Sequence, residues 1–302
     1  MFRRFGASAT IILGTLSVTN VPVAVPAPPS PSVSPVGAVS ARGVSRVAVP
    51  YVRRPAMARV VAVGHRGAAA YAPENTITGL EEGVARRAHV IEFDVRQTKD
   101  RRLILMHDAT LARTTNAEKV FPNRSPWRVG DFTLAEVRRL DAGSWFGRRF
   151  TGERVPTLGE TLRAMDGAGV SLLLEVKEPA RYPGIGARVA AELRAHAVGL
   201  PPGQLIVQSF DWGFVKRFHR LLPDVATAVL GTPSISELPA VRRYADLVNP
   251  PHRDVTRAYV SAAHRLGFRL YAWTVDDAPT MRRMIAAKVD GIISNRPDLV
   301  PT

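Results

Sequence analysis

Seven ionisable residues of this sequence follow or interrupt short apolar segments that have the length of β-strands. They are His65, Arg66, Glu92, Asp94, His107, Glu175 and Lys177. Glu92 and Asp94 are two residues apart, as are Glu175 and Lys177, so in a strand each pair points to one face. Burying such charges among apolar residues is unfavourable unless they pair with one another or bind a metal. The spacing therefore indicates that these residues converge in one functional site.

The residue types at this site favour phosphate chemistry. The three carboxylates Glu92, Asp94 and Glu175 would repel one another at one position. A hard divalent cation such as Mg²⁺ or Ca²⁺ relieves that repulsion. Arg66 and Lys177 are additional cations near the same point, and they suit an anionic substrate, most simply a phosphate.

The two histidines, His65 and His107, suit a general acid and a general base. Taken singly, each group also has an ordinary structural explanation. A histidine at a strand end is often only hydrogen-bonded, and a Glu-x-Lys pair is often an ion pair. The joint position of all the groups at the ends of predicted strands favours the functional interpretation.

Alternating strands and helices must position these groups. From residue 58 onward, amphipathic stretches of about 10–15 residues separate most of the short apolar segments, which indicates βα units and a parallel sheet. The predicted strands cover residues 60–63, 90–94, 103–107, 172–176, 205–209, 227–230, 246–248, 270–275 and 291–294.

One of these segments cannot be a parallel strand. The link 95–102 is too short for a parallel crossover, which needs about a dozen residues, but it suits a hairpin with a turn near Asp100. That turn would place Asp94 opposite His107. The remaining strands predict an α/β fold, a (β/α)₈ TIM barrel, in which site residues gather at the C-terminal ends of the strands. A doubly wound open sheet is the alternative.

Residues 109–156 interrupt the alternation of strands and helices. They are rich in turn-forming residues and contain Trp127, Trp145, Phe146 and Phe150. We interpret the segment as an insertion at the C-terminal barrel mouth. Its aromatic residues are more consistent with local packing than with a ligand platform.

The first 57 residues are not expected to belong to the barrel. Arg3 and Arg4 precede a short apolar stretch, which is typical of a secretory signal. We therefore divide the chain into a signal and Pro/Ala/Val-rich leader (1–41), a linker (42–57) and the barrel domain (58–302), and we expect a secreted or cell-envelope protein. A twin-arginine signal and a tail that is never translocated are the alternatives.

Composition narrows the class of protein further. The chain has 302 residues, 46% of them hydrophobic, no cysteine, and a net charge of +15. The lack of cysteine excludes disulfides, thiolate metal sites and a cysteine nucleophile. The basic residues lie scattered without a recognition motif, so we expect no nucleic-acid partner. The charge instead favours contact with an anionic membrane or cell-surface polymer.

Several short motifs occur in a fixed order along the predicted barrel. They are Gly64-His65-Arg66-Gly67, Ala72-Pro73-Glu74-Asn75-Thr76, Glu92-Phe93-Asp94-Val95, Thr98-Lys99-Asp100, His107-Asp108 and Arg113-Thr114-Thr115, followed by Leu174-Glu175-Val176-Lys177, Ser209-Phe210, Trp273-Thr274-Val275 and Asp290-Gly291-Ile292-Ile293. With these motifs, the region 60–300 resembles the glycerophosphodiester phosphodiesterase family.

The resemblance implies a (β/α)₈ barrel with an insertion after the His-Asp motif. It also implies that one divalent cation, Ca²⁺ or Mg²⁺, supports hydrolysis of a small glycerophosphodiester to glycerol 3-phosphate and an alcohol. His65 and His107 would be the acid–base pair, and Arg66 and Lys177 would bind the phosphate. The implied metal ligands are Glu92, Asp94 and Glu175.

A two-step reaction follows from this resemblance. One histidine would deprotonate the glycerol hydroxyl beside the phosphate, and that hydroxyl would attack phosphorus while the other histidine protonates the leaving alcohol. Water would then open the cyclic phosphate with the two roles exchanged. Three further residues are candidates for the pocket, namely Glu74 in the loop after the first strand, and Gln208 and Trp273 at strand ends.

The sequence departs from the family pattern at three places. Asp276 stands where Asn is frequent, Ser294-Asn295 where Thr-Asp is common, and Arg87-Ala88 where Gly-Ala is usual. None of these is an expected metal ligand or acid–base group, so they bear on the detail of substrate binding.

Two other functions stay open on the sequence. A phospholipase D-like enzyme of the same fold would act on lysophospholipids or sphingomyelin. It would need an apolar mouth, which the aromatic insertion could supply. A non-catalytic phosphate-binding module is the other interpretation, and the full set of histidines and carboxylates argues against it.

Overall fold

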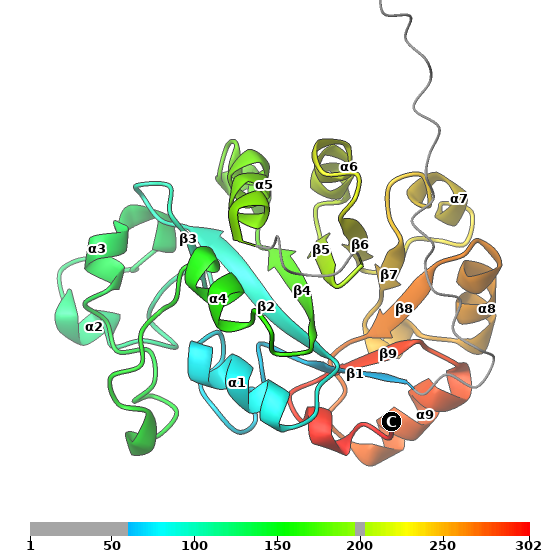
Figure 1. The fold of residues 1–302 in the computed structure, drawn as a ribbon, viewed down its shortest axis with the longest axis horizontal. Helices are drawn as coiled ribbons and strands as arrows, with labels where there is room; N and C mark the ends of the chain where they lie inside the picture. The colour runs from blue at the N-terminus through cyan, green and yellow to red at the C-terminus, as the bar shows by residue number, and fades with distance from the viewer. Residues whose placement is uncertain (1–59, 197–202) are drawn as a thin grey trace, which may run out of the picture. The chain divides into compact units, whose positions relative to one another are not determined.

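Eight parallel strands close a barrel in the computed structural model, which describes residues 60–196 and 203–302 (Figure 1). The strands follow the order β1-β9-β8-β7-β6-β5-β4-β2, and a further pairing of β1 with β2 closes the ring. β3 pairs antiparallel with β2. The predicted (β/α)₈ barrel is confirmed, and the open-sheet alternative is wrong.

The strands are short and are buried almost throughout. They span Val61–Gly64 (β1), Val90–Gln97 (β2), Leu103–Leu105 (β3), Ser171–Val176 (β4), Leu205–Ser209 (β5), Ala226–Leu230 (β6), Leu247–Asn249 (β7), Arg269–Ala272 (β8) and Gly291–Ser294 (β9). Such near-continuous burial is expected of a parallel sheet, because helices cover one face and the barrel interior fills the other.

The helices lie outside the ring of strands (Figure 1). The α-helices span Ile77–Ala85 (α1), Ala117–Val120 (α2), Leu134–Val137 (α3), Leu158–Ala164 (α4), Ile185–His196 (α5), Trp212–Leu221 (α6), Leu238–Val241 (α7), Arg257–Arg265 (α8) and Ala278–Ala287 (α9). Short 3₁₀ turns span Val129–Asp131, Arg148–Phe150, Pro179–Arg181, His252–Asp254 and Pro297–Leu299.

Threonine and aspartate side chains fix where many of these helices begin. Their oxygens accept a hydrogen bond from a backbone N–H of the first turn, which satisfies a donor that has no partner within the helix. The capping residues are Thr76, Thr133, Thr157, Asp211, Thr256 and Asp277. Each cap between a barrel strand and its helix fixes where the βα loop ends, and these loops form the rim on which a barrel places its polar groups.

Two apolar layers hold the barrel together. Each parallel strand contributes one residue to an inner cluster of Val63, Val90, Leu173, Ile206, Ala228, Leu247, Tyr271 and Ile293. A larger cluster fills the space between strands and helices. Along β2 the two layers alternate, because Phe93 and Val95 belong to the outer cluster whereas Glu92 and Asp94 face the barrel axis. The barrel core thus supports the polar residues above it.

The hairpin between β2 and β3 forms as predicted but is offset by one residue. The backbone N of Met106 donates to the carbonyl of Asp94, and Val95 pairs with Leu105. The expectation that Asp94 lies opposite His107 was therefore wrong. The turn closes through Thr98, whose hydroxyl bonds with Asp100 and Arg102. This turn sets the register, and His107 lies beyond the end of β3.

The insertion 109–156 packs around a separate apolar cluster, to which β3 and the residue after it also contribute. The cluster comprises Ile104, Met106, Leu111, Ala117, Val129, Phe132, Val137, Leu140, Ala142 and Val155. Trp127 packs against it and donates its indole N–H to the Phe121 carbonyl. Phe146 contacts both Trp145 and Phe150 edge to face. The prediction of local aromatic packing is thus confirmed for these four residues.

The predicted signal, leader and linker lie outside the described residues. Among the residues that the structure does describe, no helix combines the length and the apolar character needed to cross a membrane.

Candidate active site

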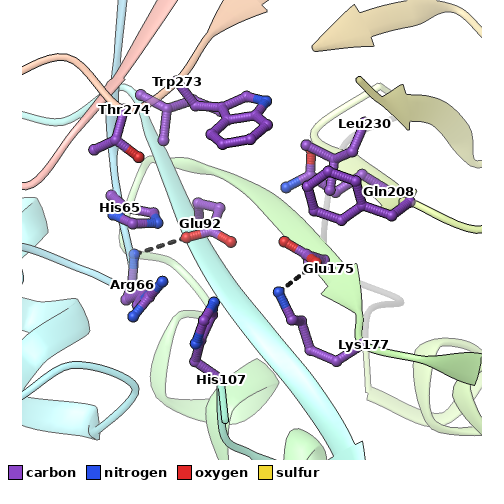
Figure 2. Close-up of a pocket in the computed structure, with 12 residues that line it drawn as sticks. His65, Arg66, Glu92, His107, Glu175, Lys177, Gln208, Leu230, Trp273 and Thr274 are labelled. Atoms are coloured by element: carbon purple, nitrogen blue, oxygen red, sulfur yellow. Dashed lines mark hydrogen bonds and ion pairs between the residues drawn. The ribbon is translucent and has the colours of Figure 1, made fainter. Parts of the chain in front are cut away.

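The C-terminal ends of the barrel strands surround one pocket (Figure 2). Its lining residues are His65, Arg66, Glu92, His107, Glu175, Lys177, Gln208, Phe210, Leu230, Trp273, Thr274 and Ile293. The structure thus brings together all but one of the ionisable residues that the sequence singled out. The remaining one, Asp94, is buried close to Glu92 and Glu175.

Three carboxylates meet at this position. The oxygens of Glu92, Asp94 and Glu175 lie within 4.8 Å of one another, and all three residues are buried. Strand register explains the encounter, because Asp94 on β2 is the direct neighbour of Glu175 on β4. Glu92 lies two residues before Asp94 and therefore faces the same side. A set of oxygen donors with this spacing fits a hard divalent cation.

Burial and mutual repulsion disturb the ionisation of these carboxyls. Burial and the charge of Asp94 raise the pKa of Glu92 well above its ordinary value, and they raise the pKa of Glu175 to about 7. Burial also opposes ionisation of Asp94, but Lys177 and Arg66 outweigh it and hold the pKa of Asp94 below its usual value. A metal ion entering this site must therefore displace protons from the two glutamates.

Lys177 shares the carboxylate cluster. Its ammonium Nζ lies 2.7 Å from Glu175 Oε1 (Figure 2). It also lies 3.6 Å from Asp94 Oδ1. On the other side of the cluster, Arg66 Nε lies 3.4 Å from Asp94 Oδ2. The side chains of Arg66 and Lys177 are thus held beside the carboxylates, where both could contact an anionic ligand bound at the cluster.

Arg66 owes its position to an unusual backbone conformation. Its φ angle is +53°, in the left-handed region, and its backbone N donates to Glu92 Oε2 at 2.7 Å. Gly67 follows with a φ of +93°, and a Cβ atom there would lie 2.2 Å from the carbonyl of Gly79 in α1. Glycine is needed for this close approach. The tight turn directs the guanidinium toward the pocket, where Nη1 bonds to Glu74 at 2.8 Å.

Each histidine has its Nδ1 engaged by another side chain. His65 Nδ1 lies 2.7 Å from Asn295 Oδ1, and His107 Nδ1 lies 2.7 Å from Asp108 Oδ1. Both rings border the pocket that Glu92 and Glu175 also line (Figure 2). Burial and the charge of Arg66 lower the pKa of His65 to about 4. Burial also lowers the pKa of His107, although nearby Asp94 and Asp108 oppose that effect.

An ion-pair network links Arg113 of the insertion to the loop after β1, which holds Glu74, and to Asp108, which follows His107. Arg113 donates two hydrogen bonds to Glu74, at 2.8 and 2.7 Å, and two to Asp108, at 2.6 and 3.0 Å. Glu74 in turn holds Arg66, and Asp108 holds His107. Glu74 itself does not line the pocket, contrary to our prediction. It acts on the pocket through Arg66.

Asn75 is a neighbour of the site to which the sequence analysis gave no role. The next residue, Thr76, caps α1. Asn75 adopts a left-handed φ of +57° and donates Nδ2 to Asp94 Oδ2 at 2.9 Å, while its Oδ1 accepts from the backbone N of Asp94. These bonds fix the orientation of the Asp94 carboxylate. Asn75 belongs to the motif Pro73-Glu74-Asn75-Thr76, but nothing in that motif indicates that its partner is Asp94.

The opposite wall of the pocket is largely aromatic. Gln208 and Trp273 line it as predicted, and Asn249 anchors both by donating Nδ2 to the Gln208 amide and accepting the Trp273 indole N–H at its backbone carbonyl. Phe210 stands edge to face with Trp273, with ring centroids 5.7 Å apart, and Phe210 is 53% exposed. This wall supplies apolar surface for the part of a ligand that carries no charge.

Comparisons with known proteins agree with this geometry. The model of the glycerophosphoryl diester phosphodiesterase family matches residues 65–299. A Bacillus subtilis protein named glycerophosphodiester phosphodiesterase is 34% identical over 80% of this chain and 85% of its own length. The crystal structure of a glycerophosphodiester phosphodiesterase from Agrobacterium tumefaciens matches with a TM-score of 0.68 and 29% identity, over 80% of this chain and 98% of that one.

A further solved structure, an Oleispira antarctica phosphodiesterase in complex with the product sn-glycerol-3-phosphate, has a TM-score of 0.72 and 25% identity. It covers 80% of this chain and 95% of that one. Likeness in sequence and in barrel architecture extends across the described domain, and we conclude that this chain belongs to the glycerophosphoryl diester phosphodiesterase family.

Proposed function

We propose that this protein hydrolyses small glycerophosphodiesters to glycerol 3-phosphate and an alcohol, with a divalent cation and His65 and His107 as the acid–base pair. The observation that carries the proposal is the convergence of two imidazoles, two carboxylates and two cations in one pocket, with the buried carboxylate of Asp94 beside it. The product bound to the Oleispira phosphodiesterase supports the choice of substrate class.

Glu92, Asp94 and Glu175 are the residues that would hold the cation. Their oxygens are close enough to share one ion, and their charges repel one another without it. When bound, a Ca²⁺ or Mg²⁺ ion would stabilise negative charge on the phosphate oxygens. The carboxylate donors do not discriminate between the two ions.

The protein's own groups account for substrate binding and proton transfer. Arg66 and Lys177 border the carboxylates and would hold the phosphate oxygens by charge-assisted hydrogen bonds. One histidine would take the proton of the glycerol hydroxyl as this oxygen attacks phosphorus, and the other would give a proton to the departing alcohol. Water would open the cyclic phosphate in the second step, with the proton transfers reversed. The aromatic wall of Phe210 and Trp273 would contact the uncharged part of the substrate.

The lipid alternative has less support from the side-chain packing than from the sequence. The aromatic residues of the insertion pack on one another and on the insertion's own cluster, and none of them lines the pocket. The apolar surface at the mouth comes from Phe210 and Trp273. A small headgroup fits this arrangement better than an acyl chain.

The test is release of glycerol 3-phosphate by the purified full-length protein after removal of bound metal. Glycerophosphocholine and glycerophosphoethanolamine are supplied with or without added Ca²⁺ or Mg²⁺. Lysophosphatidylcholine or sphingomyelin micelles are supplied in parallel, and there the release of choline is measured instead. We expect metal-dependent release from the soluble diesters. Turnover of the micelles alone would replace this proposal with the lipid activity, and no turnover of any substrate would favour a binding module.

The network around Arg113 leads to a prediction about turnover. Replacing Arg113 with lysine keeps the charge but removes the forked donor that bridges Glu74 and Asp108. We expect kcat to fall about 10-fold or more, because Glu74 and Asp108, which hold Arg66 and His107, lose the bridge that fixes them. Arg139→Lys is the matched control, since Arg139 lies in the same insertion over the Phe121 ring. Equal kcat values for the two variants would show that the bridge does not act on the site.

Export and surface contact are further proposals. We propose that residues 1–41 direct the protein to the cell envelope or medium, where its net charge of +15 would favour anionic membranes or polymers. Comparison of the N-terminus of the protein recovered from the medium, the envelope and the cytoplasm tests the first point.

A further inference from the structure

A chain of hydrogen bonds links His65 through Asn295 to Asp276. Asp276, in the segment between β8 and α9, accepts three hydrogen bonds: from Asn295 Nδ2 at 2.6 Å, from the backbone N of Asn295 at 2.8 Å, and from Ser294 Oγ at 3.0 Å. Asn295, just beyond β9, contacts His65 Nδ1 through Oδ1 at 2.7 Å. Neither Asp276 nor Asn295 lines the pocket.

The chemistry of these donors and acceptors fixes the direction of every bond. An ionised carboxylate can only accept, so the Asn295 amide must present its NH₂ group to Asp276. The amide oxygen then faces His65, and an amide oxygen also can only accept. The Nδ1 atom of His65 must therefore carry the proton. This assignment follows from the network and needs no choice of amide orientation.

The consequence appears at the other ring nitrogen. With Nδ1 protonated, the neutral His65 ring has its lone pair on Nε2, and Nε2 is the nitrogen left for the pocket that His65 borders. A proton taken from a substrate hydroxyl must be received at such a lone pair. The opposite tautomer would present N–H to the pocket and could receive no proton there.

The two histidines differ in the partner that fixes them. His107 donates to the carboxylate of Asp108, whereas His65 donates to a neutral amide. A neutral amide has two possible orientations, and the carboxylate of Asp276 distinguishes them. Asn295 alone would therefore not specify the tautomer. The bonds that Asp276 accepts orient the Asn295 amide, in addition to joining two loops.

We propose that Asp276 and Asn295 are positioning residues for His65: Asp276 orients the Asn295 amide, and the amide holds the proton on Nδ1 so that Nε2 faces the substrate. An acid at one of the two positions and an amide at the other would, in either order, supply an acceptor to His65 and a donor–acceptor pair between the two positions. The inference rests on the acid–base role proposed for His65.

The decisive variant is Asp276→Asn. An amide at position 276 can offer either a donor or an acceptor, so Asn295 loses its single orientation and the Nε2–H tautomer of His65 becomes accessible. We expect kcat to fall about 10-fold or more, with a smaller change in KM. Multiple-bond ¹⁵N–¹H spectra of the histidine rings in the full-length protein report the tautomer, and loss of one ring's signals in His65→Asn assigns His65.

Asp277→Asn is the matched control. Asp277 is the next residue, is exposed, and caps α9 by accepting from the backbone N of Thr280 at 2.8 Å. Asparagine caps helices about as well as aspartate, so this variant makes the same chemical change without touching His65. We expect wild-type kcat and a wild-type His65 spectrum. Should Asp276→Asn fail to fold, Asn295→Ala removes the acceptor of His65 directly and is expected to show the same mixed tautomer.

The double variant Asp276→Asn/Asn295→Asp tests the compensation. The amide introduced at position 276 would donate to the carboxylate introduced at position 295, and that carboxylate would accept from His65. We therefore expect the Nδ1–H tautomer to return and kcat to recover well above that of Asp276→Asn alone. A pure Nδ1–H signal in Asp276→Asn, with or without loss of kcat, would overturn the inference. Wild-type turnover by His65→Asn would instead overturn the proposed function, while the spectra would still report which tautomer Asp276 selects.

Discussion

Substitution of His107 by asparagine is expected to lower kcat for glycerophosphocholine by about 10²- to 10⁴-fold, the usual contribution of a positioned acid or base. Asparagine preserves polarity and approximate size, but it cannot carry a proton between substrate and solvent. The loss should appear in kcat more than in KM, because Arg66, Lys177 and the carboxylate cluster that hold the phosphate are unchanged. Steady-state release of glycerol 3-phosphate measures both constants.

A substrate with a reactive leaving group separates the roles of the two histidines. When the alcohol is p-nitrophenol, the departing oxygen needs little protonation, so loss of the general acid matters less. We expect His107→Asn to recover much of its deficit on this substrate and His65→Asn to recover little. The reason is that burial lowers the pKa of both rings, but at His107 the carboxylate of Asp108 opposes this effect, whereas His65 faces an amide and lies beside Arg66.

The control for these variants is His252→Asn. His252 lies in a 3₁₀ turn between β7 and α8, where its Nδ1 contacts Arg283, and it is not part of the pocket. It should keep wild-type kinetics on both substrates. Near-normal turnover of His107→Asn on glycerophosphocholine would contradict the acid–base scheme, and equal recovery of both histidine variants would contradict the assignment of roles.

Most of the barrel could be predicted from the sequence, because each strand and helix shows in the pattern of its own neighbouring residues. The alternation of short apolar segments and amphipathic helices, and the short link 95–102, sufficed to predict eight parallel strands and one hairpin. The register of that hairpin was wrong by one residue, since it depends on how Thr98 closes the turn with Asp100 and Arg102. Side-chain bonds of this kind leave no periodic pattern in a sequence.

The acidic cluster was also predictable, because strand periodicity places Glu92 and Asp94 on one face and parallel strands bring Glu175 beside them. The residues that orient the site groups could not be predicted in this way. Asn75, Arg113, Asp276 and Asn295 reach the site from loops and from the insertion, and their contacts depend on the three-dimensional closure of the barrel. Glu74 was wrongly expected in the pocket for the same reason, since its partner Arg113 is distant in sequence.

Removal and return of the metal should have an effect on stability that depends on pH. In the metal-free protein the pKa of Glu175 is about 7, against an ordinary value of 4.5, and the pKa of Glu92 is also raised. Between pH 4.5 and about 7 the folded protein therefore binds more protons than the unfolded chain. Stability falls as pH rises wherever the folded state binds more protons, so the metal-free protein should lose stability across this window.

A divalent cation competes with those same protons, so its stabilising effect should have the opposite trend. We expect Ca²⁺ or Mg²⁺ to raise Tm little at pH 5 and substantially at pH 8, in thermal melts of the full-length protein after chelation. Glu175→Gln should remove most of the metal-induced gain and flatten the pH dependence of the metal-free melt, because it carries neither charge nor titratable proton. Glu81→Gln, on the exposed face of α1, should leave both unchanged. An equal gain at pH 5 and pH 8, or a full gain in Glu175→Gln, would place the metal elsewhere than at the buried carboxylates.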